Sequence, residues 1–133
     1  MPERIQLRRT AGWRKPDGAV VVSRPTRWGN PWTVVNGHRQ GWLVYDDRDR
    51  LGLAPAATTS EGFIASYPSR EEAARNAVKR YRKWLTSSQA RVMDLVPILR
   101  GHDLCCWCPL LDRQGNLFPC HANVLLELAN ASS

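Results

Sequence analysis

The stretch S-R-E-E-A-A-R-N-A-V-K-R-Y-R-K-W-L, residues 69–85, is the clearest structural signal in the chain. Small and apolar side chains recur there at every third or fourth position, which predicts an amphipathic helix with one buried stripe. Ser69 can cap this helix, and Glu71 and Glu72 lie in the first turn, where the helix dipole favours acidic groups. The opposite face carries a set of basic residues, namely Arg75, Lys79, Arg80, Arg82 and Lys83. This basic face is either simply solvated or contacts phosphate.

Short segments on either side of this helix have the patterns of strands and of further helices. Before it, alternating or β-branched runs predict short strands at residues 4–9, 19–23, 32–35, 42–45 and 63–67. After it, the pattern predicts a helix, a strand and a closing helix at residues 88–95, 103–107 and 120–130. The sequence therefore predicts an α+β fold, with a small mixed or antiparallel sheet packed against two to three helices.

Length and composition limit the number of domains and the class of protein. The chain has 133 residues, of which 43% are hydrophobic and 23% charged, which is ordinary for one globular domain and excludes wholesale disorder. Residues 1–133 are therefore predicted to form a single domain, with a variable insert near residues 36–69. The sequence has no apolar run of the roughly 18 residues that a membrane span needs and no secretory signal at its start, so we expect a cytoplasmic protein with no membrane partner.

The charge is strongly basic and unevenly distributed. Nineteen Lys and Arg against twelve Asp and Glu give a net charge of +7, which favours acidic partners such as nucleic acid or a nucleotide. The excess lies in the first 100 residues and is mostly arginine, the side chain best suited to bidentate phosphate contacts and to stacking on bases. The alternative is that GC-rich codon usage raised the arginine content without any function.

The four cysteines form a cluster that predicts a metal site near the C-terminus. The pattern is C-x-C, then eleven residues that include two prolines and a glycine, then C-H. Cysteine thiolates and an imidazole at such spacing can close a tetrahedral zinc site. The predicted ligands of one structural zinc ion are Cys106, Cys108, Cys120 and His121, and Cys105 could substitute for one of them. The alternatives are a reactive catalytic thiol or free cysteines that pack as small hydrophobic residues.

The segment R-P-T-R-W-G-N-P, residues 24–31, is the candidate binding loop for nucleic acid or a nucleotide. Arg24 and Arg27 could clamp phosphate, while Trp28 could stack on a base. Gly29 permits a close backbone approach, and Asn30 offers both a donor and an acceptor to a base edge or ribose. The alternative interpretation is a corner that buries Trp28 in the core and leaves the arginines in solvent.

Several of these motifs together resemble the small phage and bacterial proteins grouped as domain-of-unknown-function family 4326. The resemblance rests on residues 9–14, 23–31, 81–85, 99–108 and 119–122. It implies the same four metal-site positions and the same R-P-T-R-W-G-N-P loop, but no activity. Cys105 departs from the family pattern, which implies that it is a spare thiol. Residues 36–69 are longer than the family pattern leads us to expect.

Three functional hypotheses follow. The first is a small zinc protein that binds nucleic acid or a nucleotide through the loop and the basic helix. The second is an enzyme that acts on a nucleotide or nucleobase through an open zinc ion or a reactive cysteine; a closed four-ligand site would favour the first hypothesis, and a three-ligand site with bound water the second. The third is a phage-type interaction module that binds a host protein through exposed tryptophans. The sequence identifies no catalytic residue and no oligomeric state.

Overall fold

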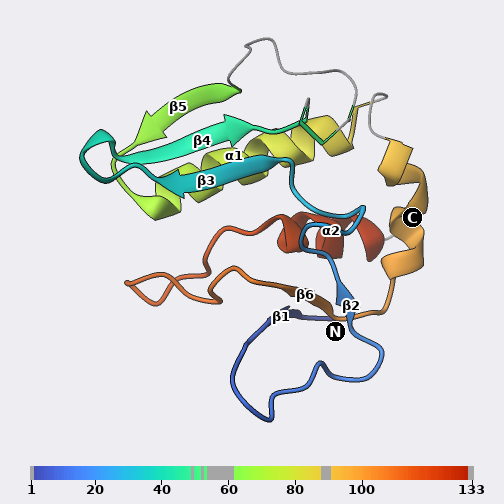
Figure 1. The fold of residues 1–133 in the computed structure, drawn as a ribbon. Helices are drawn as coiled ribbons and strands as arrows, with labels where there is room; N and C mark the ends of the chain where they lie inside the picture. Colours follow the sequence, from blue (N-terminus) through green and yellow to red (C-terminus); the bar gives the residue numbers. More distant parts are fainter. Residues whose placement is uncertain (1, 49, 52, 54–61, 88–90, 132–133) are drawn as a thin grey trace. The chain divides into compact units, whose positions relative to one another are not determined.

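The computed structural model describes residues 2–48, 50–51, 53, 62–87 and 91–131 (Figure 1). Its elements confirm the α+β class. The chain divides into two compact units, which we call the terminal unit, residues 1–29 with 92–133, and the middle unit, residues 30–91. Part of the insert predicted near residues 36–69 lies outside the described residues; its flanking parts form strands of the middle unit.

The middle unit is an antiparallel sheet with one helix packed on it. Its strands are β3 (Trp32–Asn36), β4 (Trp42–Asp46) and β5 (Phe63–Tyr67), in the order β3-β4-β5. The 3-10 turn η1 (His38–Gln40) connects the first two strands. Helix α1 (Arg70–Leu85) contacts all three strands. Each of these elements falls where the sequence predicts it, because each has a local periodic pattern.

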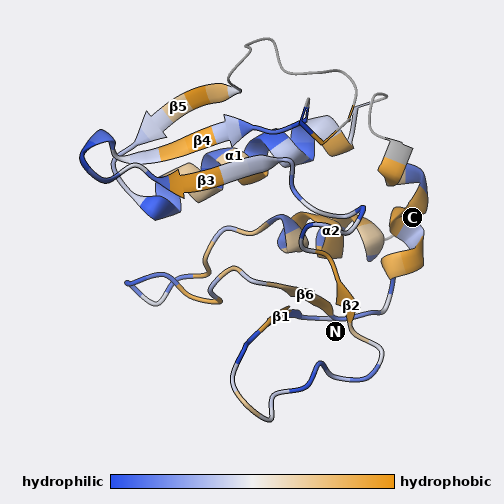
Figure 2. Ribbon diagram, viewed as in Figure 1, coloured by the Kyte–Doolittle hydropathy of each residue, from blue (hydrophilic) through white to orange (hydrophobic). Residues whose placement is uncertain are grey.

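Helix α1 buries the stripe that its sequence predicts. Its buried residues are Ala73, Ala74, Ala77, Tyr81, Trp84 and Leu85. The cap is also formed, since the Ser69 Oγ accepts a hydrogen bond of 3.2 Å from the backbone N–H of Glu72. Figure 2 shows hydrophilic residues on several turns of this helix. Among the described residues, no helix combines the length and the apolar character needed to cross a membrane.

The terminal unit is built around a second, parallel sheet. Strands β1 (Arg4–Gln6), β2 (Val20–Val21) and β6 (Leu104–Cys106) pair in the order β1-β6-β2, with hydrophobic residues along β2 and β6 (Figure 2). Helix α2 (His121–Ala129) contacts β1 and β6, and the 3-10 segment η2 (Arg91–Leu99), nearly all of it in this unit, leads into β6. The sequence predicts one sheet and the structure has two, because the alternation within a strand does not specify its distant partner.

Candidate metal centre

Three of the four predicted metal ligands converge in the terminal unit. Cys106 is the last residue of β6, Cys108 follows two residues later, and Cys120 is the N-cap of α2. Their sulfur atoms all lie within 4.8 Å of one another, and the Sγ atoms of Cys106 and Cys120 are 2.9 Å apart. All four cysteines are free rather than joined by disulfides. The three close thiols could therefore hold a metal ion.

A tight turn brings the chain back from Cys108 to Cys120. Leu111 and Leu117 form an antiparallel bridge, and between them Asp112 accepts hydrogen bonds of 2.9 Å from two backbone N–H groups. Gly115 has a φ of +82°, which glycine adopts without steric cost. This is the fold-back that the prolines and the glycine between the cysteines predict.

Strand alternation separates Cys105 from the other thiols. Successive side chains of β6 point to opposite faces, so Cys105 and Cys106 cannot share a site. Cys105 is fully buried, and this burial raises its pKa. It lies outside the three-thiol group, in agreement with the role of a spare thiol that the family resemblance implies.

His121, the fourth predicted ligand, lies beside Cys120 but outside the group of three close thiols. Its Nε2–H donates a 2.7 Å hydrogen bond to the backbone carbonyl of Val22, and its Nδ1 is 3.8 Å from the Cys120 Sγ. Because Nε2 carries the proton, Nδ1 has its lone pair on the side of the thiol. Burial lowers the pKa of His121 and keeps the ring neutral. The imidazole is thus in the protonation state that a metal ligand needs.

The three thiols do not ionise equally. Hydrogen bonds from the Cys108 and Cys120 thiols lower the pKa of Cys106 to about 2. The hydrogen bond with Cys106 raises the pKa of Cys108 to about 11. The pKa of Cys120 is raised as well, by its own hydrogen bond with Cys106. A bound cation would displace the remaining thiol protons and bind the sulfurs as thiolates.

Arg4 supports this loop, a role that its position in the sequence does not indicate. Its guanidinium donates to the carbonyl oxygens of Cys108, Pro109, Leu110 and Phe118 at 2.9–3.2 Å, and its Nη1 is 3.8 Å from the Cys106 Sγ. β1 pairs in parallel with β6, with Arg4 opposite Leu104 and Gln6 opposite Cys106, so the Arg4 and Cys106 side chains share a face. An arginine in a half-buried strand was the available signal, but its partner depends on this long-range pairing.

The predicted binding loop, residues 24–31, leaves fewer side chains available to a ligand than its sequence indicates. Trp28 is only 7% exposed, as in the alternative interpretation that places it in the core. Asn30 donates to the carbonyl oxygen of Ala77 and accepts from the backbone N–H of Trp32, so its amide stabilises the chain itself. The loop therefore offers no exposed ring for stacking.

The two arginines of this loop have different environments. Arg27 is exposed, whereas Arg24 is half-buried and close enough to His121 for its charge to lower the pKa of that ring. A Cβ at Gly29 would overlap the Arg24 side chain and lie 2.9 Å from the Arg24 backbone nitrogen. Gly29 thus allows the two ends of the loop to approach each other. Arg24 lies in the surroundings of the candidate metal centre.

Comparison with known proteins identifies the family but no characterised relative. Neither the curated proteins nor the solved structures contain a significant match to the chain. A family model described as "Domain of unknown function (DUF4326)" matches residues 5–131. This match spans both units and includes the three grouped cysteines and His121. The chain therefore belongs to the DUF4326 family.

Proposed function

We propose that the chain binds one structural zinc ion through Cys106, Cys108, Cys120 and His121, and binds nucleic acid on the surface around that site. Three sulfur donors and one imidazole nitrogen are typical of structural zinc. The carbonyl of Val22 holds the other imidazole nitrogen, and such an outer hydrogen bond usually orients a metal-binding histidine. When bound, zinc would neutralise the thiolates and tie the end of β6 to the start of α2.

A structural role is favoured over catalysis by the burial of the cysteines. Cys106 and Cys120 are each 1% exposed, whereas a catalytic thiol must reach its substrate. Four protein ligands would also leave no position for water or substrate on a tetrahedral ion. The burial of Cys106 and Cys120 therefore supports the first functional hypothesis over the enzyme.

The observation that carries the nucleic-acid proposal is the position of Trp107. All six tryptophans lie in the described residues, and Trp107, at 45% exposed, is the only one of them that is exposed. It stands between Cys106 and Cys108, and the Arg9 guanidinium lies 4.8 Å from its ring centre. An exposed indole beside a guanidinium, fixed between two metal ligands, is a suitable platform for an unpaired base. Arg27 adds exposed positive charge in the same unit.

Elemental analysis of protein purified without chelators tests the metal site. We expect about one zinc ion per chain, lost in Cys106→Ser, Cys108→Ser and Cys120→Ser and bound more weakly in His121→Ala. Cys105→Ser is the matched control and should keep its zinc. Protein without metal, or equal loss of zinc in the control, would contradict the proposal.

Binding of a fluorescent single-stranded oligonucleotide at several salt concentrations tests the nucleic-acid surface. Affinity should fall steeply with salt, and Trp107→Leu should weaken it about tenfold or more through the loss of stacking. Leu117→Ala, which removes another exposed apolar side chain of the same loop, is the control. Unchanged affinity in Trp107→Leu would exclude this platform, and salt-independent binding would favour the protein-interaction hypothesis.

A further inference from the structure

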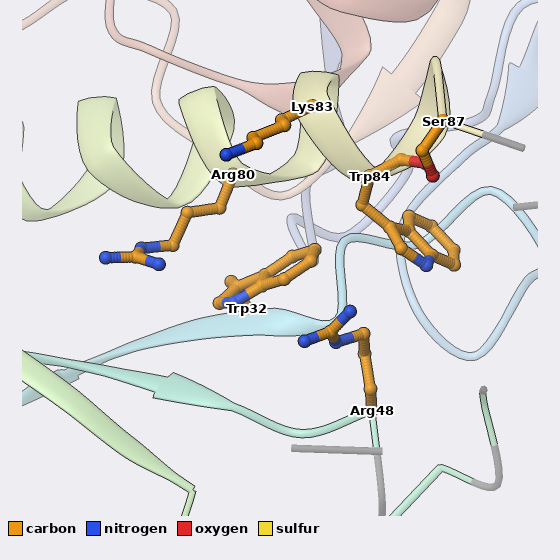
Figure 3. A pocket seen from close by; sticks show the side chains of 6 residues that line it. All are labelled: Trp32, Arg48, Arg80, Lys83, Trp84 and Ser87. Atoms are coloured by element: carbon orange, nitrogen blue, oxygen red, sulfur yellow. The ribbon is translucent and has the colours of Figure 1, made fainter. Parts of the chain in front are cut away.

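The middle unit contains a cavity that is separate from the metal centre. It has a volume of about 250 Å³ and lies between the second half of α1 and the ends of β3 and β4 (Figure 3). Arg80 and Lys83 extend from α1, Arg48 reaches in from the opposite side, and two indole rings lie between them. The lining residues are Trp32, Arg48, Arg80, Lys83, Trp84 and Ser87. None of these residues belongs to the metal centre.

Two residues that line this cavity, Trp32 and Trp84, carry a buried indole N–H without an acceptor. Trp32 and Trp84 are 6% and 7% exposed, and their rings meet edge to face with centres 6.1 Å apart. Neither indole N–H has a hydrogen-bond partner among the described residues. A buried donor that lacks its hydrogen bond is costly. The cavity therefore favours a ligand that brings acceptor atoms.

The charged groups of the cavity favour an anion. Arg48 is paired with the buried carboxylate of Asp46 at 2.8 Å and stacks on Trp32 at 4.8 Å, so its charge is already balanced. Arg80 is oriented by a 2.9 Å hydrogen bond from its Nε to the Asn76 side chain, and Lys83 follows three residues later on the same helix face. The six described lining residues include no carboxylate. Two adjacent cations are thus left to interact with a ligand.

We propose that this cavity binds the phosphate group of a phosphate monoester, such as a nucleotide or the phosphorylated end of a nucleic acid. A phosphate supplies only acceptors and carries the opposite charge, which suits indole, guanidinium and ammonium donors together. The volume is below the roughly 300–1,000 Å³ of pockets that enclose a drug-sized ligand, so the phosphate enters and the rest of the ligand extends outward. The inference does not depend on the proposed zinc site or on Trp107.

Indole N–H resonances of ¹⁵N-labelled protein provide a direct test. Inorganic phosphate should shift the Trp32 and Trp84 signals and leave those of the other four tryptophans in place. A nucleoside 5′-monophosphate and a 5′-phosphorylated oligonucleotide should reproduce these shifts, whereas the nucleoside and the 5′-hydroxyl oligonucleotide should not. Whichever phosphorylated probe binds with the lower dissociation constant identifies the source of the phosphate. No shift at Trp32 and Trp84, or equal shifts at all six indoles, would overturn the proposal.

Helix variants separate this site from general electrostatic attraction. Arg80→Gln or Lys83→Gln should weaken phosphate binding about tenfold, since each removes a charge-assisted hydrogen bond. Lys79→Gln removes an exposed charge of the same helix outside the cavity and should change binding by less than about twofold. An equal loss of phosphate binding in Lys79→Gln would overturn the proposal of a specific site. Trp107→Leu should leave these shifts unchanged, so failure of the nucleic-acid surface and failure of this cavity are distinguishable.

Discussion

Arg4 determines how the cysteine loop closes. Its guanidinium fork satisfies four backbone carbonyls of one loop and also approaches a metal-ligand candidate, Cys106. A planar group with five donors can do this, whereas an ammonium group cannot match the same geometry. Arg4 therefore places the loop carbonyls and offsets negative charge on the sulfurs.

Arg4→Lys should lower zinc affinity about 10–100-fold, the usual effect of losing an outer support of a metal site. Competition with a chromogenic chelator measures this affinity. Arg8→Lys is the matched control, because Arg8 is exposed four residues later. Equal affinity in the Arg4 and Arg8 variants would show that the charge alone, and not the guanidinium fork, supports the loop.

Gly29→Ala should destabilise the protein by about 1–3 kcal/mol, because the added Cβ overlaps Arg24 in a packed loop. Urea denaturation measures the free energy of unfolding. Gly12→Ala serves for comparison, since its Cβ would meet nothing within 4 Å and its φ of +84° costs only about 1 kcal/mol. A smaller loss for Gly29 than for Gly12 would contradict the close approach of the loop ends.

At the scale of elements, local sequence patterns predicted individual helices and strands better than they predicted which strands pair. Helix α1 and strands β3, β4 and β5 were predictable because periodicity, capping and turn residues act over a few neighbours. The parallel sheet was not, because β6 pairs with one strand 100 positions and another 84 positions earlier in the chain. The same limit applies to the site: the cysteine spacing predicted the three-thiol group, whereas Arg4 and the Trp32–Trp84 cavity depend on contacts between distant segments.

The cap of α1 offers a test of this local control. Ser69→Ala removes the acceptor for the Glu72 N–H and should destabilise the protein by about 1 kcal/mol. Thermal denaturation measures the change. Ser66→Ala, an exposed residue of β5, is the control, and an equal loss there would contradict the capping role.

At the scale of the whole molecule, the candidate metal ligands belong to one of two units. All of them lie in the terminal unit, whose parallel sheet and α2 they connect. Removal of zinc by a chelator should therefore increase amide hydrogen exchange in β6 and α2. Helix α1 carries no metal ligand and serves as the internal reference. Unchanged exchange in β6 and α2 after chelation would contradict a structural role for the metal.

The order of strands in the parallel sheet has a consequence for protein synthesis. β6 lies between β1 and β2, yet the ribosome makes β1 and β2 first and β6 only after the whole middle unit. The first two strands must therefore wait, unpaired, until the central strand emerges. Cys106 is the last residue of β6, and Cys108 and Cys120 follow it, so the three thiols also come together only late in the synthesis of each new chain.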